Sequence, residues 1–325
     1  MGVETVLLVS AKDLRELMTP RDAVAAIEEA LQAGFNPSAE LERTFIDVDE
    51  GQLALMPWRG CSSVGVKIAS IAPTNPARGL SRIQGLYIHF DKQTLTPRAL
   101  IDGPALTTLR TPAVSLAAIN HVLSSRQDPL DVVVFGAGPQ TVGHVEAIVD
   151  FCVGVQRIAS VTYLVRNLDV KRKALTGPDP RVLLASSAPE ETTLSQADVI
   201  VCATGSATPV FDAAQVKDDV IVIAVGSHQP DRREVSSDFC ARAQVVVEDV
   251  ETSLRESGDV VMAVAEGVLD VDDIIPMRNV VTASTMVDPN RPVLFQSSGM
   301  SWEDAVVAEA AVAALTTRTG SSRNE

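Results

Sequence analysis

Basic residues are in short supply in this sequence, and the shortage excludes several classes of function. The chain of 325 residues has 27 Lys and Arg against 42 Asp and Glu, a formal net charge of −15. Nucleic acids and anionic membrane surfaces bind to basic faces, so we expect neither as a partner. A small anionic ligand would need a local pocket of basic side chains.

Long apolar runs, a leader-like N-terminus and paired cysteines are also missing. No apolar run approaches the roughly 20 residues of a membrane helix. The first residues lack a basic stretch followed by an apolar core, so no secretory signal is expected. Cys61, Cys152, Cys202 and Cys240 lie far apart with no CxxC spacing, which argues against disulfides and a zinc site. We therefore expect a cytoplasmic protein with reduced thiols and no metal.

From about residue 120 to 300, short apolar runs alternate with helical stretches. The runs are β-branched and apolar on both faces, as in parallel strands covered by helices. They are Asp131–Phe135, Val161–Val165, Val182–Ala185, Val199–Ala203, Val220–Val225, Val245–Val247 and Val280–Thr282. Val142–Phe151 and Asp169–Leu175 suit crossover helices. The pattern predicts an α/β fold with a Rossmann-type, doubly wound parallel sheet.

The first 120 residues have a different pattern. Helices are predicted over Ser10–Leu17 and Pro20–Ala33, the second with Thr19 as N-cap, and a third over Thr107–Leu123. Between them, residues 43–99 are rich in strand and turn signals. A last helix is predicted over Trp302–Leu315 and is expected to pack back on the N-terminal part.

These patterns give two expected domains. Residues 1–120 with 303–325 form a second α+β domain built from both chain termini, for substrate binding and dimerisation. Residues 121–302 form the Rossmann domain that binds NAD(P).

The segment after the first central strand carries the strongest nucleotide signal. Gly136-Ala137-Gly138 follows a fully apolar strand and precedes a helix that starts near Pro139 and Gln140. Gly136 permits a sharp turn, Gly138 lets a pyrophosphate approach the backbone, and the helix N-terminus offers unpaired N–H donors. The usual third glycine is absent, with Thr141 in its place, which indicates a variant of the fingerprint.

The end of the second strand indicates which cofactor binds. An acidic residue there would hydrogen-bond the ribose 2′-hydroxyl of NAD. This strand ends instead in Arg166 and Asn167, with Lys171 and Arg172 close behind, and these groups suit the 2′-phosphate of NADP. NADP (as NADPH) is therefore favoured over NAD, although the same residues also fit an ordinary solvated helix start. The predicted cofactor-binding set ends with two residues after later strands, Thr204 and Gly226.

Several motifs together resemble the ornithine cyclodeaminase/mu-crystallin family. The variant loop, residues 136–140, is similar to that family's GxGxQ. Further matching segments are Met56-Pro57, residues 65–67, 75–80, 105–111, 226–234, 256–259 and 295–304. The resemblance covers about residues 40–312. It implies a Rossmann domain, a dimerising domain made from both termini, and an active site in the cleft between them.

The resemblance also implies a set of cations for the substrate. Arg43, Lys67 and Arg110 match the family's groups that hold the substrate α-carboxylate. The physics agrees, because an anionic, amino-acid-like substrate of an acidic protein needs a local cationic clamp. Lys67 lies in an apolar strand-like run, where an amine is costly unless it has a partner.

Two residues depart from the cyclodeaminase pattern. His228 follows the strand Val220–Val225, where the resemblance implies an aspartate in cyclodeaminases and a serine in mu-crystallins. A histidine there can donate or accept a proton near neutral pH, or it only contacts the cofactor or caps a helix. Ala54 stands where cyclodeaminases place a glutamate for the distal ammonium, which argues against ornithine cyclisation. His89, His121 and His144 are expected to be structural, and no His pair has metal-ligand spacing.

The leading hypothesis is an NADPH-dependent reductase of small cyclic ketimines, such as pyrroline- or piperideine-2-carboxylate, acting as a homodimer. Lys67 or His228 would govern the proton on the imine. Three alternatives stay open: a cyclodeaminase that releases ammonia from ornithine with bound NAD, an alanine dehydrogenase-like amino-acid dehydrogenase, and a non-catalytic protein that binds NADPH or a small ligand.

Overall fold

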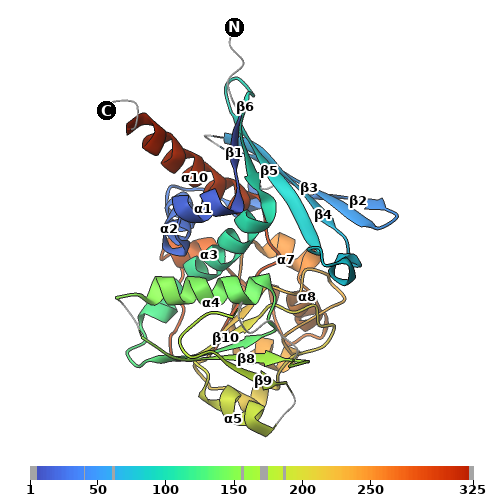
Figure 1. Cartoon of the computed structure of the whole chain (residues 1–325). Helices are drawn as coiled ribbons and strands as arrows, with labels where there is room; N and C mark the ends of the chain where they lie inside the picture. The colour runs from blue at the N-terminus through green and yellow to red at the C-terminus, as the bar shows by residue number, and fades with distance from the viewer. Residues whose placement is uncertain are drawn as a thin grey trace. The chain divides into compact units, whose positions relative to one another are not determined.

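The computed structural model describes residues 6–39, 41–60, 63–154, 157–168, 175–185 and 188–321. The chain packs into two units (Figure 1). The terminal unit consists of Met1–Ala30, Ala39–Arg110 and Met300–Glu325. The central unit consists of Leu31–Ser38 and Thr111–Gly299. The α/β fold class, with a Rossmann-type sheet and a second domain built from both termini, is confirmed.

The units divide within helix α3 (Gly103–Ser124), between Arg110 and Thr111. The sequence pattern places the domain limit after residue 120, further along the same predicted helix. The second half of α3 instead belongs with the central unit, where Ser115 Oγ lies 3.1 Å from His144 Nε2. The other limit falls at Gly299/Met300 rather than after residue 302.

A six-stranded sheet forms the centre of the terminal unit. Its order is β1-β6-β5-β4-β3-β2, with β1 and β6 parallel and the other pairs antiparallel. The strands are β1 (Leu7–Val9), β2 (Thr44–Val48), β3 (Gly51–Arg59), β4 (Ser63–Ile71), β5 (Ile83–Asp91) and β6 (Pro97–Asp102). Buried and less buried residues alternate along β3 and β4, as expected for a sheet covered on one face.

Helix α10 (Ser301–Ser321) covers that buried face and packs on β3, β4 and β5 (Figure 1). It also contacts α1 (Ala11–Leu17). Helix α2 (Pro20–Gln32) begins at the expected N-cap, because Thr19 Oγ1 accepts from Asp22 N at 3.2 Å. The expectation that the last helix packs on the N-terminal part is confirmed.

An eight-stranded, fully parallel sheet forms the centre of the central unit. Its order is β13-β12-β14-β11-β10-β7-β8-β9. The strands are β7 (Leu130–Phe135), β8 (Ile158–Val165), β9 (Arg181–Leu184), β10 (Val199–Cys202), β11 (Ile221–Ala224), β12 (Gln244–Val247), β13 (Ile275–Pro276) and β14 (Val293–Gln296). The strand order reverses between β7 and β10, so the carboxyl ends of these two strands form the switch point where such sheets bind ligands.

Helices cover this sheet, and β10, β11 and β14 are buried along their whole length. Besides the second half of α3, the central unit contains α4 (Pro139–Cys152), α5 (Ala188–Gln196), α6 (Ser237–Arg242), α7 (Val250–Glu256), α8 (Gly258–Ala265) and α9 (Met277–Val281). Alternate strand residues such as Val133, Ile200 and Val222 share one core cluster with Phe239 of α6 and Val260 of α8.

In the central sheet one predicted strand is wrong and two real strands, β13 and β14, were missed. Val280–Thr282 lies at the end of helix α9 and just beyond it. β14 is inserted between β11 and β12, and β13 pairs with β12 at the edge of the sheet. A three-residue apolar run has no period, so it does not distinguish a strand from a buried helix turn. The predicted helix Asp169–Leu175 lies, apart from its last residue, outside the described residues.

Within the described part of the chain, none of the helices combines the length and the apolar character that a membrane crossing needs.

Candidate cofactor and substrate sites

The turn between β7 and α4 lies at the switch point of the central sheet. Gly136 has φ +102°, a conformation that side chains other than glycine rarely adopt. Its amide N–H donates to Leu164 O at 2.8 Å, which ties the turn to β8. The backbone therefore turns sharply at the residue that the sequence assigned to this turn.

The N-terminus of α4 is open. Gly138 is the N-cap with no side-chain hydrogen bond, and Pro139 begins the helix. A Cβ added to Gly138 would meet no atom within 4 Å. The backbone N–H groups of the next two residues, Gln140 and Thr141, precede the first intrahelical bond, which Val142 N makes to Gly138 O. Open space in front of unpaired helix N–H groups suits a pyrophosphate.

Arg166 and Asn167 directly follow β8 and are exposed, at the place where a Rossmann fold contacts the adenosine ribose. The described residues before position 169 therefore place one guanidinium, and no carboxylate, at the end of this strand. Lys171 and Arg172 lie outside the described residues.

The loops after β10 and β11 are joined by one buried carboxylate. Glu234 Oε1 accepts from Thr204 N at 2.5 Å and from Thr204 Oγ1 at 2.6 Å. Its other oxygen accepts from Gly226 N at 2.7 Å. Both of these predicted cofactor residues therefore share a partner that the sequence analysis did not assign.

His228 lies in the loop after β11 and is exposed. Its Nδ1 is 3.1 Å from Gly226 O, so this nitrogen donates to the carbonyl when it carries a proton.

Lys67 lies on β4 in the terminal unit and is buried among polar groups. Its Nζ is 2.5 Å from Asp304 Oδ2 and 3.4 Å from Thr107 Oγ1. Burial lowers the pKa of Lys67, and the adjacent carboxylate of Asp304 opposes that shift. The expectation that an amine in this apolar strand needs a partner agrees with this geometry.

Arg110 joins the same cluster from α3. Its NH1 donates to Glu303 Oε2, and its Nε lies 3.4 Å from Asp304 Oδ1. The two cations and two carboxylates form a buried group with no formal net charge, and both acidic side chains are 0% exposed. Two of the three predicted clamp residues are thus brought together through Asp304.

The third predicted clamp residue, Arg43, precedes β2, two strands away from β4 in the sheet. Its guanidinium lies 5.5 Å from the ring centroid of Phe45. Ala54 is buried on β3, on the same face as Lys67. Its methyl group offers no partner for a distal ammonium.

Sequence reasoning missed four acidic residues around these sites: Glu234, Asp259, Glu303 and Asp304. All four are buried. The signal was present, because Glu303 and Asp304 open a helix that otherwise consists largely of alanine and valine. A carboxylate in an apolar context is expected to pair, but the sequence does not name its partner.

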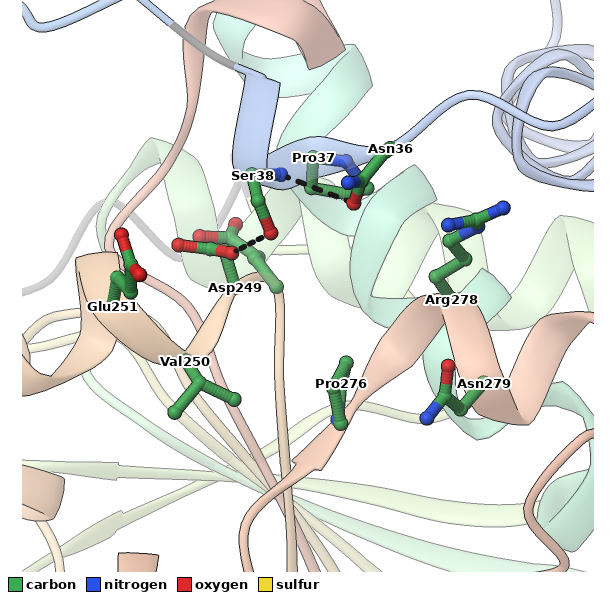
Figure 2. Close-up of a pocket in the computed structure, with 10 residues that line it drawn as sticks. Asn36, Pro37, Ser38, Asp249, Val250, Glu251, Pro276, Arg278 and Asn279 are labelled. Carbon is green, nitrogen blue, oxygen red and sulfur yellow. Dashed lines mark hydrogen bonds between the residues drawn. The ribbon is translucent and has the colours of Figure 1, made fainter.

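A separate cavity of about 370 Å³ lies in the central unit. Figure 2 shows Ser38 pointing to Asp249, whose Oδ1 accepts from Ser38 Oγ at 2.6 Å. Arg278 and Asn279 of α9 line another part of the cavity. None of its ten lining residues belongs to the predicted site.

Comparison with known proteins shows the family of this chain. The profile of the ornithine cyclodeaminase/mu-crystallin family matches residues 4–315. The chain belongs to this family. The GxGxQ-like turn and the buried Lys67–Arg110 cluster are thus features of an ornithine cyclodeaminase/mu-crystallin protein.

Individual relatives within the family have different activities. A Delta(1)-pyrroline-2-carboxylate reductase of Bacillus cereus is 28% identical over 324 residues, which cover 94% of this chain and 95% of the relative. An alanine dehydrogenase of Archaeoglobus fulgidus is 26% identical over 311 residues and 93% of each chain. The structure of Thermococcus litoralis Delta(1)-pyrroline-2-carboxylate reductase in complex with NADH and L-proline has a TM-score of 0.84, 25% identity and coverage of 97% of this chain and 98% of that chain.

Proposed function

We propose that this protein is an NAD(P)H-dependent reductase of small cyclic ketimines of the Delta(1)-pyrroline-2-carboxylate type, which it converts to cyclic amino acids. The single observation that carries the proposal is the buried cluster of Lys67 and Arg110 around Asp304. It places two cations beside Asp304 and Glu303 in a family whose relatives include reductases of such substrates.

The central unit is proposed to hold the cofactor. Its turn at residues 136–140 and the open N-terminus of α4 fit a pyrophosphate. Thr204 and Gly226 follow the neighbouring strands β10 and β11 and are proposed to complete the cofactor site at the carboxyl edge of the sheet. A bound reduced nicotinamide would supply the hydride that the imine carbon accepts.

The terminal unit is proposed to orient the substrate. Arg110 carries a planar fork that suits a bidentate carboxylate contact, and Lys67 adds a second positive charge. An imine must be protonated to accept hydride. Burial lowers the pKa of Lys67, which makes its ammonium group a stronger acid than that of an exposed lysine, and Lys67 is therefore one candidate proton donor. His228 is the other candidate for this role.

An amino-acid dehydrogenase is the second candidate, favoured by the likeness to an alanine dehydrogenase over 93% of each chain. Such an enzyme would act on an open-chain 2-oxo acid and would need ammonia. Ornithine cyclisation is disfavoured by Ala54 and by His228.

The deciding experiment measures NADPH and NADH oxidation with Delta(1)-pyrroline-2-carboxylate, its six-membered homologue and pyruvate, each with and without ammonia. The proposal expects ammonia-independent turnover of the cyclic ketimines. Turnover of pyruvate alone among these, and only with ammonia, would establish the dehydrogenase instead. Ammonia release from ornithine without net NADH formation would establish a cyclodeaminase. Cofactor binding without turnover of any substrate would indicate a binding protein.

We further propose that NADPH is preferred over NADH, because Arg166 and Asn167 stand where NAD enzymes carry an acid. The variant Arg166→Asp removes a cation and adds a carboxylate there. It is expected to weaken NADPH binding by about ten-fold or more and to leave NADH binding within a few-fold. Equal loss for both cofactors would contradict this role, as measured by fluorescence titration.

The protein is proposed to act as a homodimer in the cytoplasm. The face of the terminal sheet opposite α10 carries a row of apolar side chains, Leu55, Ile68 and Leu86, on three neighbouring strands. Ile68 and Leu86 are exposed, and apolar surface of this kind is typical of association sites. Cys152, Cys202 and Cys240 are buried, and none of the three is in a disulfide, in keeping with a reducing compartment.

A further inference from the structure

The loops that follow β10 and β11 are connected through the side chain of Glu234. This residue is 0% exposed, and its two oxygens accept three hydrogen bonds at 2.5–2.7 Å. Two donors belong to Thr204 and the third is the backbone N–H of Gly226. Because β10 and β11 are adjacent parallel strands, this carboxylate lies at the carboxyl edge of the sheet, next to the switch point.

The two loops pack against each other at Gly226, where there is no room for a side chain. A Cβ added to Gly226 would lie 2.0 Å from Thr204 O and 2.6 Å from Glu234 Oε2. A side chain at this position would therefore push the loops apart. The position of each loop depends on the other and on the carboxylate between them.

Glu234 is itself held by a second buried acid. Asp259, at the start of α8, accepts from Glu234 N at 2.7 Å and from Val235 N at 2.8 Å through one oxygen. Glu234 O in turn accepts from Val210 N at 2.8 Å. The backbone on both sides of the carboxylate is therefore fixed, so the direction of the side chain is set.

We propose that Glu234 is a positioning residue for the cofactor site at the carboxyl edge of the central sheet. Its ionised carboxylate holds Thr204 and Gly226 in the arrangement that the nicotinamide cofactor requires. This inference rests on the proposed function of the central unit. Two N–H groups and one O–H group donate to this side chain, so both of its terminal atoms must be acceptors, as in a carboxylate. A glutamine would replace one acceptor oxygen by an NH2 group facing another donor.

The charge of Glu234 depends on pH in the range where enzymes are assayed. Burial raises the pKa of Glu234 to about 7, and the neighbouring Asp259 raises it too, whereas the hydrogen bonds from Thr204 and Gly226 lower it. Other titratable and charged groups near this carboxylate are the buried thiol of Cys202, Arg232 and Arg233 in its own loop, and His228. Affinity for NADH is therefore expected to fall as the pH decreases through about 7.

The test compares Glu234→Gln with a matched control, Asp198→Asn. Asp198 precedes β10 at the opposite edge of the sheet and also joins two segments, because it accepts from Asp131 N at 2.8 Å and Lys217 Nζ at 2.7 Å. Glu234→Gln is expected to weaken NADH binding at pH 8 by about ten- to one-hundred-fold. Asp198→Asn is expected to leave the Kd for NADH within about two-fold, even though both variants lower thermal stability.

A second readout separates positioning from general destabilisation. As the pH is lowered from 8 to 6, the Kd for NADH is expected to rise both in the wild type and in His228→Asn. In Glu234→Gln the Kd is expected to stay the same over this range. NADH is used in place of NADPH because it has no 2′-phosphate, whose own titration would change the measured Kd.

Wild-type binding of NADH by Glu234→Gln at pH 8 would overturn the inference. A wild-type Kd for NADH that does not change between pH 8 and pH 6 would also overturn it. This measurement needs only the wild type, so it holds even if Glu234→Gln does not fold. If the wild type bound neither NADH nor NADPH, the proposed function would fail instead.

Discussion

At the scale of single residues, Asp304 determines how two buried cations are held. Its Oδ2 pairs with Lys67 and its Oδ1 lies beside Arg110, so one side chain fixes the spacing of both predicted clamp residues. Glu303, its neighbour, accepts from Arg110 and from Met300 N. A buried cation without its carboxylate is costly, because its desolvation is no longer offset.

Asp304→Asn is therefore expected to destabilise the protein by about 3–5 kcal/mol and to abolish most ketimine reduction. Urea unfolding measures the first effect and steady-state kinetics the second. Glu309→Gln on the same helix is the control. Glu309 accepts from the neutral Ser63 Oγ at 3.0 Å, so its loss is expected to cost only about 1 kcal/mol. Equal costs for the two variants would contradict the pairing argument.

A buried histidine makes a contribution of its own. His144 Nδ1 donates to Gln140 O at 2.7 Å in the first turn of α4, and burial lowers the pKa of His144 to about 4. A folded-state pKa below the unfolded value means that the neutral form is favoured on folding. The resulting stability is present above about pH 6.5 and is lost as the pH falls toward 4.

On acidification from pH 7 to pH 5, the wild type is expected to lose about 2 kcal/mol of unfolding free energy relative to His144→Gln. The comparison must be made between variants, because the raised pKa of Glu234 has the opposite sign and stabilises the fold on acidification. His121→Gln, at an exposed histidine near the end of α3, is the control and is expected to follow the wild type. A pH-independent difference between wild type and His144→Gln would rule the linkage out.

At the scale of elements, the β7–α4 turn separates two uses of glycine. Gly136 requires its positive φ, although a Cβ there would have ordinary contacts of 3.6 Å or more. Gly138 has φ −84°, which any residue adopts, and open space in front of it. The first glycine therefore serves the backbone, and the second leaves room at the helix N-terminus.

Gly136→Ala is expected to lower stability by about 1–3 kcal/mol, because alanine must adopt a strained conformation. Gly138→Ala is expected to keep the wild-type unfolding free energy within about 0.5 kcal/mol and yet to weaken NADPH binding, since the methyl group occupies the approach to the helix. Chemical denaturation and cofactor titration of both variants provide the test. A destabilised Gly138→Ala, or one with unchanged affinity, would refute this division.

At the scale of the whole molecule, the open face of the terminal sheet determines the expected assembly. Leu86 and Ile68 are direct cross-strand neighbours, 48% and 37% exposed, and the opposite face of the sheet is covered by α10. An apolar sheet face is stable in water when a second surface covers it.

Leu86→Glu is expected to shift the protein from dimer to monomer in light scattering, because it places a charge in the proposed interface. Met286→Glu is the control, since Met286 is an exposed apolar residue of the central unit, 65% exposed and outside this face. A wild-type monomer, or a Leu86→Glu dimer of unchanged affinity, would contradict the assignment.

Most of the fold could be predicted because its signals are local. The strand at Asp131–Phe135, the glycine turn after it and the helix beyond follow from apolar runs and backbone freedom, which depend only on neighbouring residues. The same logic failed at Val280–Thr282, where three apolar residues carry no period. It also missed β13 and β14, whose places beside β12 depend on strand pairing over long separations.

The sequence by itself determined the α/β class, the glycine turn at residues 136–140 and the family. Only the tertiary structure decided which acid meets which cation or loop. Lys67 and Asp304 are 237 positions apart, and Glu234 reaches Thr204 across 30. The first pair forms because the last helix packs on β4, and the second because the loops after β10 and β11 lie next to each other. No local sequence pattern encodes either contact. Buried charges then require the partners that these contacts supply.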